Sequence, residues 1–538
     1  MNESAAGDRT LIGRPTAAVI GVVAAAVALG AGELVAGIGG NGPSLVSAVG
    51  TEFVDRYAAS LKDLAVRLFG TNDKVALIVG IVAMSLLFGA VLGIAGRRRP
   101  LVAAAGFLGF GVLGLYAYLG DELGQMSIGV LAAAASVAGG LGSLWLLLRV
   151  APARPATYVA PRSAPVDGTG DPVQFDTPGP RSASRRTFIT TAAALAVTAG
   201  GTAVLGRRVR PTNVVETARR QTVLPKPGSS VVPPASQPFE VPGLSSYITS
   251  TADFYRIDTA ITTPQIAGGS WELEIKGMVD EPFSIGYEEL LALDSLEDVV
   301  TLQCVSNEVG GNLVGTAVWQ GVPLGALLER AGVDPAATQI VGRSADGWTA
   351  GFPTEHATDG RTALVAYAMN GEPLTAVHGF PARLLVAGLY GYVSATKWLT
   401  EIELTTWEDF DGYWVPRGWS KEGPIKTMSR IDVPGSGSPV TAGRVAIAGV
   451  AWAPTDGVSA VEVQVDDGDW RDCELGEASS GNTWVQWKLD WDATPGEHRL
   501  RARATNAAGE TQTEDRAAPA PNGATGWHTR QVRVRGKR

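Results

Sequence analysis

Apolar residues are concentrated near the N-terminus, in long runs that carry few charges. Four of these runs are about 20 residues long and consist mostly of Ala, Val, Leu, Ile and Gly, which is enough to cross the ~30 Å hydrocarbon core of a membrane as a helix. We therefore expect residues 1–150 to form an all-α transmembrane domain of four helices. The runs are 16–39, 75–96, 101–119 and 127–150.

Arginines flank these runs on one side of the expected membrane, which predicts that both ends of the domain are cytoplasmic. The runs contain no histidine. Because a membrane haem is most often held by histidine pairs, an anchor or docking platform is the expected role. Glu33 is the one carboxylate within a run. Its place near the outer end favours a snorkelling or helix-contact role, and a functional site is the alternative.

A second membrane signal lies in mid-chain. Residues 151–183 are rich in Pro, Gly, Ser and Thr and are expected to form a linker. The Ser-Arg-Arg-Thr-Phe sequence that follows, with an Ala-rich apolar run behind it, resembles a twin-arginine export signal. An ordinary fifth span is the alternative, and both interpretations place the later residues outside the cytoplasm. We expect residues 184–206 to be a fifth membrane span and the Pro-rich residues 207–244 to be a second linker.

The pattern changes again in the second half of the chain. Short strands and helices alternate over residues 245–432, which indicates an α+β domain. Residues 271–275 alternate as a strand, and residues 287–293 and 324–331 have the pattern of short helices. Residues 433–538 contain alternating strands separated by turn signals, which is typical of an all-β sandwich of immunoglobulin type. The strands expected there are 444–452, 460–465, 484–491, 498–504 and 529–535.

Charge and cysteine content narrow the function classes. The net charge of −9 argues against nucleic-acid binding. The two cysteines, Cys304 and Cys473, cannot form a disulfide scaffold. Cys304 follows the apolar run 299–302 and precedes Gly310 and Gly311, where the backbone can approach another group closely. A buried structural cysteine and a thiolate ligand of a soft metal both fit this position.

Seven motifs between residues 254 and 534 occur in a characteristic order. They are FYRIDT (254–259), TLQCVSN (301–307), VWQGVPL (318–324), MNGEPL (369–374), HGFPARLLV (378–386), GLYGY with TKWL (388–399) and GWHTRQVRV (526–534). Together with the β-rich C-terminus, they resemble the sulfite oxidase family of molybdopterin enzymes. The resemblance covers about residues 245–535 and implies an oxidoreductase with a molybdenum–molybdopterin cofactor.

The resemblance implies catalytic roles for three residues. Cys304 would be the thiolate bound to molybdenum, and a soft thiolate suits such a metal. Arg256 would lie beside the oxo and substrate side, with a surface ion pair as the alternative. Tyr413 matches a tyrosine that the family keeps near the metal.

Further residues match family positions that hold the cofactor. His378, Arg383 and Lys397 match positions that bind the pterin and its phosphate, a role for which cations and a ring N–H are suited. Asp346 falls near a carboxylate that binds pterin amines, with an ordinary Asp-Gly turn as the alternative. The complete cofactor-binding set implied is Tyr255, Arg256, Cys304, Asp346, His378, Arg383, Ser394, Thr396 and Lys397.

One departure from the family bears on the substrate. Sulfite oxidases have two consecutive arginines after the asparagine of the cysteine motif, whereas Glu308 and Val309 follow Asn307 here. Fewer cations and an added carboxylate disfavour a dianion. We therefore expect oxygen-atom transfer on a neutral small molecule such as a sulfoxide or N-oxide. Sulfite oxidation by the same site, and a non-catalytic binding or scaffold protein that retains the fold, are the alternatives.

The expected partners follow from the same features. The chain has neither a CxxCH haem site nor iron–sulfur cysteines, so a separate electron-transfer partner is needed, either a cytochrome or a quinone-linked membrane protein. The C-terminal sandwich is the family's dimerisation module, which implies a homodimer. We expect a multi-pass protein of the cell membrane whose catalytic domain is extracytoplasmic.

Overall fold

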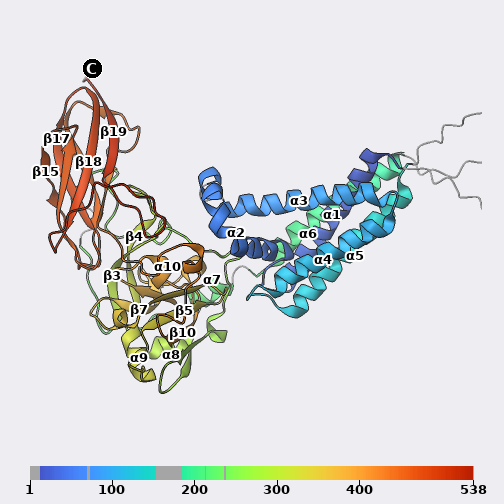
Figure 1. Ribbon diagram of the computed structural model, residues 1–538, viewed down its shortest axis with the longest axis horizontal. Coiled ribbons are helices and arrows are strands. Elements are labelled where there is room, and N and C mark those ends of the chain that lie inside the picture. The colour runs from blue at the N-terminus through green and yellow to red at the C-terminus, as the bar shows by residue number, and fades with distance from the viewer. Residues whose placement is uncertain are drawn as a thin grey trace, which may run out of the picture. The chain divides into compact units, whose positions relative to one another are not determined.

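The computed structural model describes residues 12–40, 42–69, 73–152, 185–211, 214–234 and 238–536. The chain divides into two compact units, Met1–Thr212 and Asn213–Arg538, which can be followed by colour in Figure 1. The expected linker from residue 153 to 183 and Ser184 of the twin-arginine-like sequence lie outside the described residues.

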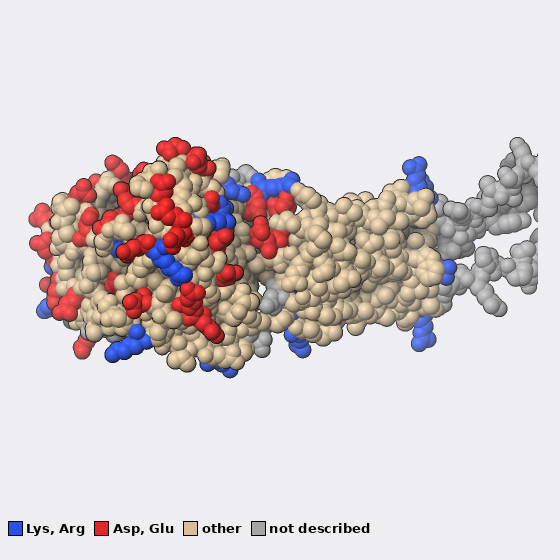
Figure 2. Space-filling model, turned by 90° about the horizontal axis from the view of Figure 1, so that it is seen from below, with Lys and Arg blue, Asp and Glu red and all other residues tan. Residues whose placement is uncertain are grey.

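The described residues of the N-terminal unit are mainly helical. Within the described ranges, five helices are long and apolar enough to cross a membrane, and these include the four runs predicted from the sequence. Figure 2 shows an almost uncharged surface along this unit, with Lys and Arg side chains near its ends. The helices are α1 (Arg14–Ile38), α2 (Leu45–Phe69), α3 (Asp73–Gly96), α4 (Pro100–Leu119), α5 (Met126–Val150) and α6 (Arg185–Val209).

Glycines allow the helices of this unit to approach closely. A Cβ added at Gly21 of α1 would collide with the backbone of Gly89 of α3, and one added at Gly37 of α1 would collide with Gly206 of α6. Small residues at such crossings are typical of helix packing in membranes, where backbone proximity replaces the hydrophobic driving force.

Two sheets and several short helices form the first part of the C-terminal unit. One sheet has the order β2-β1-β10-β5-β6, and the other has the order β3-β4-β7-β8 with β9 also paired to β7. Their buried side chains form one hydrophobic core. The strands are β1 (Glu272–Gly277), β2 (Phe283–Gly286), β3 (Leu296–Gln303), β4 (Val314–Pro323), β5 (Gln339–Ser344), β6 (Thr349–Pro353), β7 (Ala363–Met369), β8 (Glu372–Pro373), β9 (Arg383–Val386) and β10 (Leu399–Thr405).

The helices of this part are short. The predicted helices at 287–293 and 324–331 are confirmed as α8 and α9. The α-helices are α7 (Val214–Gln221), α8 (Tyr287–Ala292), α9 (Leu324–Ala331) and α10 (Gly391–Ser394), and the 3-10 helices are η2 (Gly268–Ser270), η3 (Thr354–Ala357), η4 (Ala376–His378) and η5 (Val415–Arg417).

Two further sheets share a separate core near the C-terminus. Their orders are β11-β13-β17-β16 and β12-β19-β18-β14-β15, and Trp487 of one sheet packs in the same cluster as Leu500 of the other. All five strands expected there are confirmed as β13, β14, β17, β18 and β19, while an immunoglobulin-type connection remains a prediction. The strands are β11 (Met428–Val433), β12 (Val440–Thr441), β13 (Gly443–Trp452), β14 (Val458–Val465), β15 (Trp470–Asp472), β16 (Glu474–Leu475), β17 (Val485–Ala493), β18 (Gly496–Asn506) and β19 (His528–Arg535).

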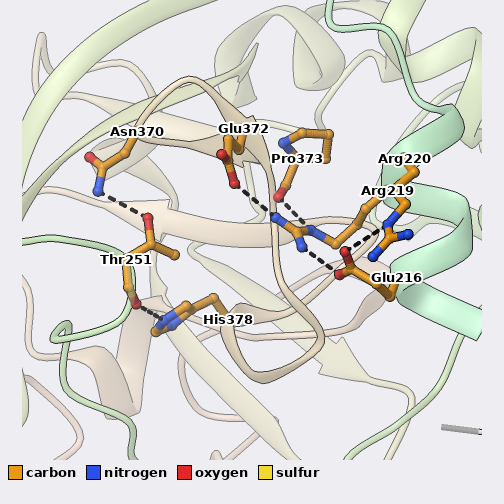
Figure 3. Close-up of polar contacts among 8 residues, drawn as sticks. All are labelled: Glu216, Arg219, Arg220, Thr251, Asn370, Glu372, Pro373 and His378. Atoms are coloured by element: carbon orange, nitrogen blue, oxygen red, sulfur yellow. Dashed lines mark hydrogen bonds and ion pairs between the residues drawn. The ribbon is translucent and has the colours of Figure 1, made fainter. Parts of the chain in front are cut away.

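Two boundaries differ from the expectation. The expected division between residues 432 and 433 falls inside β11, which pairs with β13 and therefore belongs to the C-terminal sheets. The expected linker 207–244 contains α7, whose Val215 is buried in the core of the neighbouring domain. Arg219 of α7 donates to the Pro373 carbonyl at 2.9 Å and pairs with Glu372 (Figure 3). The Pro-rich composition predicted a linker because it carries no sign of these long-range contacts.

Candidate active site

Cys304 lies where strand β3 ends, as its sequence position predicts. Its side chain is buried, and its backbone N–H donates to the Leu313 carbonyl at 2.9 Å. Asn307 closes the loop from inside, because its N–H donates to the Cys304 carbonyl at 3.0 Å and its Oδ1 accepts from the Leu313 N–H at 2.9 Å. The thiol is therefore held on a short, internally bonded loop that returns into β4.

Two residues of the C-terminal sheets contact the loop that carries Cys304. Arg430 of β11 donates to the Gly311 carbonyl at 3.0 Å and forms an ion pair with Asp432 at 2.7 Å. His528 of β19 packs directly against Gly310, whose φ of +80° and lack of a Cβ allow the contact. The Nδ1 of His528 accepts from the Ile431 N–H at 2.8 Å. Sequence reasoning missed Arg430 and His528, although His528 lies within one of the seven motifs.

Two tyrosines interact electrostatically with Cys304. Burial raises the pKa of Tyr255, and the Cys304 charge raises it further. Burial and the same thiol raise the pKa of Tyr390 to about 12. Both phenols therefore keep their protons at neutral pH. Tyr390 was not predicted, although it lies in the GLYGY motif. The predicted Tyr413 lies beside β6, where its N–H donates to the Thr349 carbonyl at 3.1 Å and Arg417 covers its ring at 3.7 Å.

Arg383 is a buried cation at the start of β9. Its nitrogens donate to the carbonyls of Leu384, His378 and Ala395 at 3.3–3.4 Å. No carboxylate of the described residues forms an ion pair with it, and burial lowers the pKa of Arg383 to about 10. An unpaired buried guanidinium is costly, so the position is suited to an anionic ligand.

His378 lies next to Arg383 and is neutral. Burial lowers the pKa of His378 to about 4. The Nε2 atom lies 3.0 Å from the Thr251 carbonyl, and Figure 3 shows that Asn370 donates to the hydroxyl of the same threonine. Because a carbonyl only accepts, Nε2 carries the proton and Nδ1 remains an acceptor.

Lys397 and Arg256 share one carboxylate that sequence reasoning missed. Lys397 donates to Asp258 at 2.7 Å, and Arg256 pairs with the same oxygen at 3.2 Å. Burial lowers the pKa of Lys397 to about 8. Arg256 is partly exposed, so the ion pair considered as its alternative role is present. Burial also raises the pKa of Asp346, which interacts with both Asp258 and Lys397.

The two predicted hydroxyl residues are bonded within the fold. Ser394 donates to the Tyr390 carbonyl at 3.2 Å, and Thr396 donates to the Gly342 carbonyl at 3.4 Å. Both side chains are fully buried. The structure thus brings Cys304, Tyr255, His378, Arg383, Lys397 and Asp346 into one region, with Ser394 and Thr396 behind it.

Known proteins share this part of the chain. Residues 260–414 match the family described as "Oxidoreductase molybdopterin binding domain". The "Uncharacterized oxidoreductase YuiH" of Bacillus subtilis is 37% identical over 153 residues, which are 28% of this chain and 74% of that protein. The chain belongs to the sulfite oxidase family of molybdopterin-dependent oxidoreductases. The cofactor of this family is molybdenum–molybdopterin.

Other relatives of this oxidoreductase are more distant or longer. Mitochondrial sulfite oxidase of Rattus norvegicus is 28% identical over 288 residues, which cover 45% of this chain and 52% of the relative. The NADH nitrate reductase of Solanum lycopersicum is 32% identical over 177 residues, and only 19% of it is covered. The sulfane dehydrogenase SoxCD of Paracoccus pantotrophus has a TM-score of 0.48 and 22% identity over 56% of this chain and 88% of that chain.

The residues of this oxidoreductase fit the family's cofactor. Among the residues that the structure describes, no three His, Cys, Asp or Glu side chains are grouped to hold a metal ion. Cys304 would supply a thiolate to the metal of the cofactor. The unpaired guanidinium of Arg383 and the buried ammonium of Lys397 fit the negative charge of a pterin phosphate.

Proposed function

We propose that this protein is a membrane-anchored oxidoreductase that removes an oxygen atom from a neutral sulfoxide or N-oxide on the extracytoplasmic face. The charge balance around Cys304 carries the proposal. Of the three predicted cations, Arg256 and Lys397 already share Asp258, and Arg383 faces the region expected to hold the phosphate. With Glu308 exposed directly after the cysteine motif, the Arg256, Lys397 and Asp258 group leaves at most one unneutralised positive charge for a dianionic substrate.

The protonated tyrosines support a neutral oxide as substrate. When bound, the cofactor supplies two-electron oxygen-atom transfer. Cys304 would hold its metal, and His378, Arg383 and Lys397 would hold the pterin. A phenol with the ordinary pKa of tyrosine is protonated at neutral pH, and burial raises the pKa of Tyr255 and Tyr390 further. Their O–H groups are therefore donors that an S=O or N–O oxygen can accept.

Two substrate classes tested on one preparation distinguish this proposal from sulfite oxidation. The full chain would be produced in a host that makes the cofactor and assayed with sulfite, methionine sulfoxide and trimethylamine N-oxide. We expect turnover of at least one oxide in the presence of an artificial electron donor. Turnover of sulfite alone would contradict the charge argument, and absence of molybdenum from the wild-type protein would contradict the enzyme assignment.

The second cysteine provides a matched control for the metal ligand. We expect Cys304→Ser to remove most of the molybdenum and the activity. Cys473→Ser should retain both, because Cys473 lies between β15 and β16, where burial raises its pKa to about 12. Equal molybdenum content in the two variants would exclude Cys304 as the protein ligand.

The membrane location rests on the five apolar helices. We place residues after 206 outside the cytoplasm, with 184–206 as a twin-arginine-like anchor, and we assign electron delivery to a separate partner. Reporter fusions after residues 152 and 211 should report opposite sides. A homodimer formed through the C-terminal sheets is expected, and light scattering of the detergent-solubilised chain would detect it.

A further inference from the structure

The helical unit contains a large cavity that the proposed chemistry does not use. Its volume is about 600 Å³ and it lies between helices α1, α2, α3, α4 and α5. This volume falls within the roughly 300–1,000 Å³ typical of small-molecule sites. The wall is almost entirely apolar, with side chains such as Leu29, Ile81 and Phe107. Because apolar cavities exclude water, a hydrocarbon chain from the membrane is the fitting occupant.

The polar groups of the cavity restrict its occupant further. Glu33 of α1 and Asp73 of α3 line it, and no Lys or Arg does so within the described part of the chain. Asp73 already accepts a hydrogen bond from the Lys74 N–H at 2.8 Å. A carboxylate on an apolar wall needs a hydrogen-bond donor. The phosphate of a phospholipid would be repelled here, whereas a neutral hydroxyl head group would donate to Glu33.

We propose that this cavity binds a membrane hydroquinone, with a ring hydroxyl on Glu33 and its isoprenyl tail along the apolar wall. The choice of a hydroquinone rests on the proposed function. Reduction of one sulfoxide to a sulfide and water consumes two electrons and two protons, which is what one hydroquinone releases when it becomes a quinone. The separate partner of the proposed function would carry these electrons from the hydroquinone to the active site. The volume and the polarity of the cavity support binding independently of that reaction.

Two glycines allow a matched test of the cavity. A Cβ at Gly80 of α3 or at Gly109 of α4 would meet nothing within 4 Å. Gly80 lines the cavity, whereas Gly109 does not. Leucine at either position is therefore tolerated by the backbone, but only Gly80→Leu fills the space that the tail would occupy.

Direct binding to the full chain is the measurement. The purified protein in phosphatidylcholine nanodiscs would be titrated with decylubiquinol under anaerobic conditions, with empty nanodiscs as the blank. We expect one saturable site in the wild type and an affinity about tenfold weaker in Gly80→Leu and in Glu33→Gln. The controls Gly109→Leu and Glu122→Gln should keep the wild-type affinity. Glu122 is a suitable control because its side chain is exposed in the α4–α5 connection.

Several outcomes would overturn the hydroquinone site. They are the absence of saturable binding to the wild-type chain, equal affinity in Gly80→Leu and Gly109→Leu, and displacement of the probe by phosphatidylglycerol. Molybdenum content and oxide reduction with an artificial donor, measured on the same preparation, separate a failure of this site from a failure of the proposed function.

Discussion

Two buried arginines should respond in opposite ways to the same substitution. Arg383 and Arg430 are 6% and 8% exposed, so their environments are matched for burial. Arg430 has a carboxylate partner in Asp432, whereas Arg383 has only carbonyl acceptors at 3.3 Å or more among the described residues. If Arg383 is kept for an anionic cofactor, its charge should destabilise the cofactor-free protein. Replacement of each arginine by methionine tests this.

The expected magnitudes follow from the pKa shift and from the ion pair. Burial lowers the pKa of Arg383 from 12.5 to about 10, which corresponds to about 3 kcal/mol against the charged form. Loss of its weak hydrogen bonds offsets part of this, so Arg383→Met should change the unfolding free energy by zero to about 2 kcal/mol in favour of folding. Arg430→Met leaves the Asp432 side chain, which is 9% exposed, without its ion pair and with the Ser245 N–H as a remaining donor, and it should cost about 3–5 kcal/mol.

The assay compares stability with cofactor retention. Thermal unfolding would be measured on full-length protein from a host that cannot make the cofactor, and molybdenum content on protein from a host that can. We expect Arg383→Met to unfold at or above the wild-type temperature when cofactor-free and yet to lose most of its molybdenum. A cofactor-free Arg383→Met as unstable as Arg430→Met would refute the inference that Arg383 awaits an anion.

Three further variants test the surroundings of the site. Burial lowers the pKa of Lys397 to about 8, so above that pH the folded state binds fewer protons than the unfolded state. The unfolding free energy of the cofactor-free wild type should therefore rise by up to about 3 kcal/mol between pH 8 and 10.5. Denaturant titrations should show no such rise in Lys397→Met. Burial lowers the pKa of His528 to about 4, so the stability contributed by its neutral form is complete above pH 6.5 and is lost as the pH falls through 4. In His528→Gln the unfolding free energy should fall less over this acid range, by up to about 3 kcal/mol. The same fall in the variant and the wild type would contradict a buried neutral imidazole. In Gly311→Ala the new Cβ would lie 2.5 Å from Asn307 Oδ1 and would disturb the loop that Asn307 closes around Cys304. Iodoacetamide should therefore alkylate Cys304 of the cofactor-free protein faster in this variant than in the control Gly109→Ala. Equal rates would show that Asn307 does not hold the loop.

The prediction of individual elements succeeded where local pattern decides structure. The apolar runs became helices, and the alternating runs after residue 440 became strands. The linker expected at 207–244 contains α7, because Val215 and Arg219 are stabilised by residues far along the chain, which composition does not reveal. The boundary at 432 failed for a similar reason, since β11 is assigned to its sheet by pairing with β13.

The site shows the same division between local and long-range information. The motifs identified Cys304, His378, Arg383 and Lys397, but not the groups that face them. The Lys397–Asp258 pair spans 139 positions and the Arg430–Gly311 bond spans 119. Such partners become visible only when the sheets bring distant segments together. The roles assigned to Tyr413, Ser394 and Thr396 remain predictions.

The sequence by itself determined the apolar spans, the strand-end position of Cys304 and the family of the enzyme, because each depends on residue types at short spacing. The tertiary structure alone decided which charges are paired. It gave Lys397 and Arg256 a common carboxylate and left Arg383 with none among the described residues. Whether a buried cation stabilises the fold or is suited to an anion depends on its neighbours in space, and strand pairing determines those neighbours.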